Sequence, residues 1–170
     1  MKNVLLIVAV FFSFAANAQV TKVSLQASGL TCSMCSKAIN KSLQSLDFVD
    51  KVEANIKNSA FNISFKPNAV IDFDKLKKQV EDAGFFVASF TATISFDKLA
   101  IANDTHVNVG SNVFHFLNVK EQILSGNKTI RLLDKGFVPT KEFKKNSNLT
   151  KMGCYKTGEE NGKRIFHVTI

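Results

Sequence analysis

The sequence predicts an α+β protein: a ferredoxin-like domain followed by a small, mainly β domain that is a barrel or a sandwich. Two observations predict this fold class. Residues 19–91 alternate between the two-residue period of half-buried strands and the 3.6-residue period of amphipathic helices, in the order β-α-β-β-α-β. Residues 92–170 contain short β-like runs separated by turns, a spacing typical of a small all-β unit.

The first residues, 1–18, have the pattern of an export signal. Lys2 gives a positive start, residues 4–15 are almost wholly apolar, and Ala16-Asn17-Ala18 supplies the small residues that signal peptidase recognises. The apolar run is shorter than the roughly 20 residues that a transmembrane helix needs. We therefore predict cleavage after Ala18 and a periplasmic or secreted mature protein without a membrane span.

A strand and a helix follow the signal. In residues 20–28, Val23, Leu25 and Ala27 fall on one face, which predicts a half-buried strand that ends before Gly29. Thr31 or Ser33 is suited to cap the helix that comes next. The apolar stripe of this helix is predicted to consist of Cys35, Ala38, Ile39, Ser42, Leu43 and Leu46.

The rest of the first domain is predicted as a hairpin, a second helix and a last strand. Two alternating runs, 52–56 and 61–65, are separated by the polar turn 57–59. Asp72 is expected to cap the second helix, and Gly84 to end it, because these residue types satisfy the exposed backbone groups at helix ends. The buried face of this helix is predicted to contain Phe73, Leu76, Val80 and Ala83, and residues 85–90 form the last strand.

Helical periodicity largely disappears after Ala92. Residues 141–148 are predicted as either a short helix or a loop. The predicted β-like runs are 92–96, 106–109, 113–119, 129–133, 154–157 and 164–170.

The charge of the chain excludes few functions. The formal net charge is +8, but the basic residues are scattered, and the densest group, residues 141–145, includes Glu142. This distribution is typical of a solvated surface, and export separates the protein from nucleic acid, so we expect no nucleic-acid partner. No catalytic constellation emerges from the sequence, and we expect a binding protein rather than an enzyme.

Three cysteines are an odd number for an exported protein, and two of them, Cys32 and Cys35, form a CxxC pair. A zinc site usually needs a second Cys or His pair at a set distance. A redox dithiol needs a thioredoxin-like scaffold, which usually has a cis-proline loop, and neither Pro67 nor Pro139 is well placed for one. The pair lies between a predicted strand and a predicted helix, whose N-terminus stabilises thiolate. This setting favours a soft metal ion held by two thiolates.

Residues 20–90 resemble the heavy-metal-associated domain of copper chaperones, of the N-terminal part of copper-transporting ATPases and of the periplasmic mercuric-ion-binding protein. The resemblance rests on Gly29-Leu30-Thr31-Cys32-Ser33-Met34-Cys35, Phe48-Val49-Asp50-Lys51-Val52 and Ala83-Gly84-Phe85. It implies that Cys32 and Cys35 are the metal ligands and that Phe85 lies near the metal loop. Leu30 replaces the usual methionine and is expected to keep its inward packing.

The resemblance also bears on the metal and the partner. Members that prefer zinc tend to place an acidic residue where this chain has Thr31, which favours copper(I) as the ion, with mercury(II) or zinc as alternatives. We therefore predict an exported copper(I) chaperone or scavenger that exchanges the ion with a metal-donating or metal-accepting protein such as a transporter. The alternatives left open are a mercuric-ion scavenger and a thiol–disulfide oxidoreductase that uses the same cysteine pair.

Weaker candidates lie on both sides of the predicted domain boundary. Met34 stands between the two cysteines, and we expect it to face solvent or a partner rather than the ion. Met152, Cys154 and His167 would make a soft-ligand set for a second metal site if their segments were neighbouring strands. The more common outcome is that such residues simply pack in a core.

His106 and His115 flank the predicted turn at residues 110–112 and are expected to face each other across a hairpin. We assign them no function, because such pairs usually arise without one. Residues 92–170 as a whole carry no recognisable motif. Docking to a membrane transporter is one role that this region could have.

Overall fold

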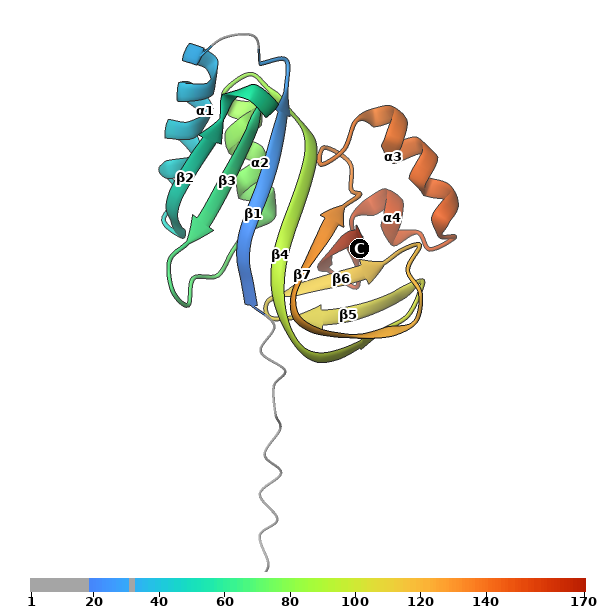
Figure 1. Ribbon diagram of the computed structural model, residues 1–170. Coiled ribbons are helices and arrows are strands. Elements are labelled where there is room, and N and C mark those ends of the chain that lie inside the picture. Colours follow the sequence, from blue (N-terminus) through green and yellow to red (C-terminus); the bar gives the residue numbers. More distant parts are fainter. Residues whose placement is uncertain (1–18, 31–32) are drawn as a thin grey trace, which may run out of the picture.

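The computed structural model describes residues 19–30 and 33–170, so the predicted export signal, Thr31 and Cys32 lie outside the described residues. The predicted order β-α-β-β-α-β is confirmed (Figure 1). Its strands pair antiparallel in the order β2-β3-β1-β4. The elements are β1 (Gln19–Ser28), α1 (Ser33–Gln44), β2 (Val49–Asn55), β3 (Ala60–Phe65), α2 (Phe73–Asp82) and β4 (Phe86–Ile101).

Helices α1 and α2 lie side by side on one face of these strands (Figure 1), and the hydroxyl of Ser42 in α1 donates to the carbonyl of Gln79 in α2 at 3.2 Å. The predicted apolar faces of both helices are turned to the core, with Ile39 and Leu43 buried in α1 and Phe73, Leu76 and Val80 buried in α2. The other predicted positions are partly buried, apart from one difference in α1. Ser36 is buried and Ala38 is exposed, because the stripe of this helix is turned slightly toward Ser36. The predicted turn of the hairpin is a short 3₁₀ turn, η1 (Ile56–Asn58).

Both ends of α2 are built as the sequence predicts. The Asp72 carboxylate accepts a hydrogen bond from the backbone N–H of Lys75 at 3.0 Å, which satisfies an otherwise unpaired donor at the helix start. Gly84 has a φ of +85° and donates to the carbonyl of Glu81, while the N–H of Phe85 donates to the carbonyl of Val80. Glycine adopts this left-handed conformation without steric cost, and so the chain turns directly from α2 into β4.

The C-terminal strands continue the same sheet instead of forming a separate barrel or sandwich. The full order is β2-β3-β1-β4-β7-β9-β6-β5, with the two-residue strand β8 paired to β9. The elements after β4 are β5 (Thr105–Val109), β6 (Asn112–Phe116), β7 (Gln122–Leu132), α3 (Thr140–Asn146), η2 (Ser147–Leu149), α4 (Cys154–Thr157), β8 (Glu159–Glu160) and β9 (Lys163–Thr169). The α+β class is therefore confirmed. The N-terminal and C-terminal parts, however, share one sheet, whereas the sequence predicted a separate β domain at the C-terminus.

Strand β4 makes this connection. It is 16 residues long, pairs with β1 along one edge and with β7 along the other, and runs along much of the molecule (Figure 1). The sequence suggested two runs, 85–90 and 92–96, but no glycine or proline separates them, so the backbone stays extended. A register shift between Phe96 and Leu99, with Lys98 at a φ of +48°, marks an irregularity further along. The predicted boundary between residues 91 and 92 thus falls within a strand, and the division into two domains stays a prediction.

The hydrophobic core also extends across both parts. The ring of Phe73 in α2 lies 5.3 Å from the ring of Phe90 in β4 and 5.3 Å from that of Phe166 in β9, measured between centroids. Phe114 of β6 lies 6.2 Å from the same ring. Because aromatic rings at these separations contribute packing as well as buried area, α2 holds the two parts of the sheet together.

One predicted strand is wrong. Residues 154–157 form the short helix α4, closed by Gly158 at a φ of +75°, whose N–H donates to the Cys154 carbonyl at 2.7 Å. Tertiary contacts override the local preference, because the buried Tyr155 hydroxyl donates toward the carbonyls of Leu133 and Phe143. The segment predicted as a helix or a loop, residues 141–148, contains most of α3 and the start of η2. Within the described part of the chain, no helix is long and apolar enough to cross a membrane.

Candidate metal sites

The first candidate site is the loop between β1 and α1. Cys35 lies in the first turn of α1 and is half-buried, as the sequence predicts, whereas Cys32 lies outside the described residues. Met34 is 70% exposed, in agreement with the expectation that it faces solvent or a partner. Assignment of Cys32 and Cys35 as a ligand pair stays a prediction.

The surroundings of this loop are suited to a thiolate. Gly29 has a φ of +81°, which lets the chain leave β1 sharply. No acidic residue lies in the first turn of α1, so no carboxylate there offsets the positive end of the helix dipole. Leu30 is partly buried against the core, which confirms its predicted inward packing, and Phe85 packs against the same core.

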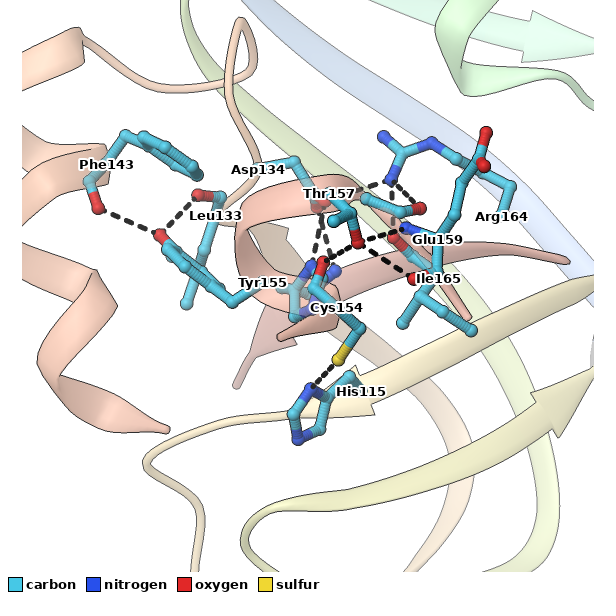
Figure 2. Close-up of polar contacts among 12 residues, drawn as sticks. His115, Leu133, Asp134, Phe143, Cys154, Tyr155, Thr157, Glu159, Arg164 and Ile165 are labelled. Atoms are coloured by element: carbon cyan, nitrogen blue, oxygen red, sulfur yellow. Dashed lines mark hydrogen bonds and ion pairs between the residues drawn. The ribbon is translucent and has the colours of Figure 1, made fainter. Parts of the chain in front are cut away.

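A second group of ligands lies in the C-terminal part, where His106 of β5, His115 of β6 and Cys154 of α4 come together. The Cys154 Sγ lies 3.5 Å from His106 Nε2 and 3.6 Å from His115 Nδ1, and the three ligand atoms all lie within 4.8 Å of one another. Figure 2 shows the sulfur directed at the His115 ring. His115 is fully buried and Cys154 is 5% exposed, whereas the His106 side chain is 22% exposed, so the cluster is mostly but not wholly buried.

Each of the two histidines has a carboxylate on the ring nitrogen that faces away from the sulfur. Asp104 lies 2.9 Å from His115 Nε2, and Glu160 lies 3.0 Å from His106 Nδ1. A carboxylate oxygen only accepts hydrogen bonds, so these nitrogens carry the protons. In the neutral ring, the nitrogen facing Cys154 then has a free lone pair.

The pKa shifts describe the same cluster in its metal-free form. Burial lowers the pKa of His115, the neighbouring His167 adds to this, and the contact with Asp104 opposes it, so the ring is neutral. Burial raises the pKa of the Cys154 thiol, with a further contribution from the Glu160 carboxylate. The sulfur therefore keeps its proton and lies between two imidazoles that can accept it.

His167, the third histidine, is part of the support for this cluster. Strand pairing places His106 opposite His115 and His115 opposite His167, in one row across β5, β6 and β9. The His167 Nδ1 lies 2.9 Å from buried Asp134. Asp134 also accepts from Arg164 at 3.1 Å (Figure 2). The His167 Nε2 is buried without a hydrogen-bond partner among the described residues.

The structure thus groups the C-terminal residues differently from the weaker candidate set of Met152, Cys154 and His167 that the sequence offered. Cys154 joins His106 and His115, the pair to which no function was assigned, while Met152 is 39% exposed. The sequence contained one usable signal, the symmetric placement of the two histidines about the turn at residues 110–112. The contact of these two histidines with Cys154 depends on the packing of α4, and no local sequence pattern predicts that contact.

Two kinds of chemistry use such a cluster. The first is nucleophilic catalysis by cysteine, in which a thiol contacts an imidazole and the imidazole contacts a carboxylate. That role needs a thiol that substrate can reach and a lowered pKa, but Cys154 is buried and its pKa is raised. The second is metal binding, which fits the cluster better than a nucleophilic cysteine does. Two imidazole lone pairs and one sulfur face a common point, and histidine and cysteine are preferred ligands of copper and zinc.

Residues 24–86 match the family model of the heavy-metal-associated domain. This part of the chain is therefore a heavy-metal-associated domain, and it contains the second half of β1 together with α1, β2, β3 and α2. The cluster of His106, His115 and Cys154 lies beyond the matched residues.

Two curated relatives are copper ATPases. The probable copper-exporting P-type ATPase of Archaeoglobus fulgidus is 31% identical over 85 residues, which make up 50% of this chain and 10% of the relative. A copper-transporting ATPase of Helicobacter pylori is 38% identical over 64 residues, 38% of this chain and 8% of the relative. The chain thus spans about a tenth or less of the length of these relatives.

Solved structures match over a similar portion of the chain. The yeast copper transporter domain Ccc2a is 28% identical with a TM-score of 0.36, and the alignment covers 39% of this chain and 90% of that domain. Oxidized MerP from Ralstonia metallidurans is 28% identical with a TM-score of 0.37, over 42% of this chain and 94% of MerP. Both alignments cover less than half of the chain.

Proposed function

We propose that this chain binds a soft metal ion, copper(I), through the thiolates of Cys32 and Cys35 and passes it to another protein. The observation that carries the proposal is the heavy-metal-associated domain in which Cys35 occupies the first turn of α1, directly after the strand–helix loop. Two thiolates suit a two-coordinate soft cation. The relatives named as copper ATPases support copper, and Thr31, where zinc-preferring members place an acidic residue, supports it further.

Transfer would occur by thiolate exchange without any change of oxidation state. A thiolate of the partner forms a bond to copper(I), the bond to Cys32 breaks, and the departing thiolate takes up a proton from solvent. Cys35 is released in a second exchange of the same kind, because it lies within α1 whereas Cys32 precedes this helix. The exposed Met34 side chain supports the proposal, since an apolar surface beside the loop suits the approach of a partner protein.

We further propose that the protein works outside the cytoplasm, as the signal pattern of residues 1–18 suggests, and that it is a binding protein rather than an enzyme. In that compartment the cysteine pair is exposed to oxidation, and bound copper(I) would protect it. A donor or acceptor such as a metal transporter is the partner that this chemistry requires.

Copper(I) retention by the full chain under reducing conditions tests the proposal. The measurement is native mass spectrometry of a Cys154→Ser chain, in which the C-terminal ligand cluster is disabled and only the loop cysteines remain. We expect this chain to hold a copper(I) ion and a Cys32→Ser/Cys35→Ser/Cys154→Ser chain to hold none. Equal retention by the two chains, or no retention by either, would reject the proposal.

A matched control and a redox assay complete the experiment. Met34→Leu in the Cys154→Ser chain changes the residue between the cysteines without removing a thiolate, and it should retain the ion. The competing oxidoreductase hypothesis predicts that the cysteine pair exchanges with a model disulfide faster than glutathione does. Such turnover, in a chain that does not retain copper(I), would favour the enzyme.

A further inference from the structure

We propose that His106, His115 and Cys154 form a second metal site, which holds one copper(I) ion through two imidazole nitrogens and one thiolate. The proposal goes beyond the function of the loop cysteines and does not depend on it. The cluster lies outside the heavy-metal-associated domain, on α4, β5 and β6, far from the start of α1 (Figure 1). The two sites are therefore separate in space as well as in sequence.

The distances from the Cys154 sulfur to the two imidazole nitrogens fit a single ion bound by these atoms. Metal–nitrogen bonds of about 2.0 Å and metal–sulfur bonds of about 2.3 Å, at angles of roughly 110–120°, place nitrogen and sulfur about 3.5–3.8 Å apart. The observed separations from the Cys154 sulfur are 3.5 Å to His106 and 3.6 Å to His115.

The two carboxylates prepare the histidines for this role. By accepting from the outer ring nitrogens, Asp104 and Glu160 fix the tautomers whose lone pairs face the sulfur. A histidine that donates its other N–H to a carboxylate is the usual arrangement at protein metal sites, and it also raises the basicity of the ligand. Both histidines of the cluster have this arrangement.

The ligand types and their number favour copper(I). A thiolate with two imidazoles is a soft donor set that excludes hard ions such as magnesium and calcium. Zinc usually takes a fourth ligand, whereas three ligand atoms come together in the described cluster, those of His106, His115 and Cys154.

Binding exchanges one proton for one ion. The Cys154 thiol loses its proton to solvent as the copper–sulfur bond forms, and both imidazoles bind as neutral ligands, so copper stays in the monovalent state. Ligands supplied by a hairpin and a helix that are already packed in the core need little rearrangement. The sheet register that pairs His106 with His115 keeps two of the three ligands in place.

The test uses the full-length Cys32→Ser/Cys35→Ser chain, in which Cys154 is the remaining cysteine. Copper(I) is added anaerobically against a chromophoric copper(I) chelator, and the bound ion is examined by X-ray absorption. We expect one ion per chain, coordinated by one sulfur and two nitrogens. Cys154→Ser in this background should abolish copper(I) binding. His106→Asn or His115→Asn should weaken the binding by at least about tenfold, because loss of a group that only supports a metal-bound residue already has an effect of this size.

Controls separate this site from its neighbours and from the loop. Met152→Leu removes the nearby exposed sulfur and should leave both affinity and coordination unchanged. Circular dichroism and thermal unfolding of each metal-free variant check that it is folded. A copper environment without sulfur, equal binding after Cys154→Ser, or tighter binding of zinc(II) than of copper(I) would overturn the proposal. None of these results affects the loop cysteines, which are tested in the Cys154→Ser chain.

Discussion

The loop before α1 and the cluster over β5 and β6 contain similar ligands in opposite surroundings. Cys35 is half-buried beside an exposed Met34, whereas Cys154 and His115 are buried and the histidines are held by carboxylates. If the loop cysteines bind an ion, an incoming thiolate could reach it more easily there than at the buried cluster. If the buried cluster binds an ion, its pre-arranged ligands are suited to keeping it. On these proposals, ligand type alone does not decide what a metal site does, and access to the ion does as well.

The largest effect is expected from Phe73→Ala, which asks whether the two regions are structurally independent. Phe73 is fully buried and contacts rings from β4, β6 and β9, so its loss should lower the free energy of unfolding by about 3–5 kcal/mol. We expect one cooperative transition in urea, followed by circular dichroism, with both regions affected. Phe86→Ala, at a 72% exposed position, is the control and should change little.

Two separate transitions, with only the N-terminal one shifted by Phe73→Ala, would contradict the shared core. They would instead support the division at residues 91 and 92 that the sequence suggests. In that case the two metal sites would belong to independent units, and their comparison would be one between domains.

The second prediction concerns the support of the buried ligands. Asp104→Asn removes the carboxylate from His115 and should weaken copper(I) binding at the buried site by about 10–100-fold. The same change should leave the loop cysteines unaffected, as measured in the Cys154→Ser chain. Asp97→Asn removes an exposed carboxylate elsewhere and serves as the matched control. A similar loss for both variants would point to a general charge effect.

The third prediction compares the rates at which the two sites release copper(I). In stopped-flow transfer to a chelator, the Cys154→Ser chain should release the ion at least about tenfold faster than the Cys32→Ser/Cys35→Ser chain, since the buried site must open first. A tenfold difference corresponds to about 1.4 kcal/mol of opening free energy. Equal rates would remove the distinction between a transfer site and a retaining site.

The smallest effect is expected from pH, through the ion pair that joins α2 to β9. Burial alone would raise the pKa of the Asp74 carboxyl. The contacts of this carboxylate with Arg164 and Lys77 outweigh burial, so the pKa of Asp74 is lowered from the ordinary 3.8. The carboxylate therefore stabilises the fold fully above pH 3.8, and this contribution is lost as the pH falls through the lowered pKa. Asp74→Asn should flatten this part of the acid unfolding curve, and an unchanged curve would show that the pair contributes nothing.

Much of the N-terminal half could be predicted because its signals are local. The burial of Val23, Leu25 and Ala27, the cap at Asp72 and the glycine at residue 84 each depend on neighbours within a few positions. Periodicity and capping act at that range, so one sequence is enough to predict them. The position of Cys35 in the first turn of a helix follows from the same signals.

The sequence by itself therefore determined the β-α-β-β-α-β unit and the place of Cys35 in it. Only the tertiary structure decided that β4 joins both regions in one sheet, that residues 154–157 are helical, and that Cys154 meets His106 and His115. The parallel pairing of β6 with β9 and the distance of about fifty residues between Cys154 and His106 depend on long-range packing. Such contacts form because the whole core is compact, and no local pattern encodes them.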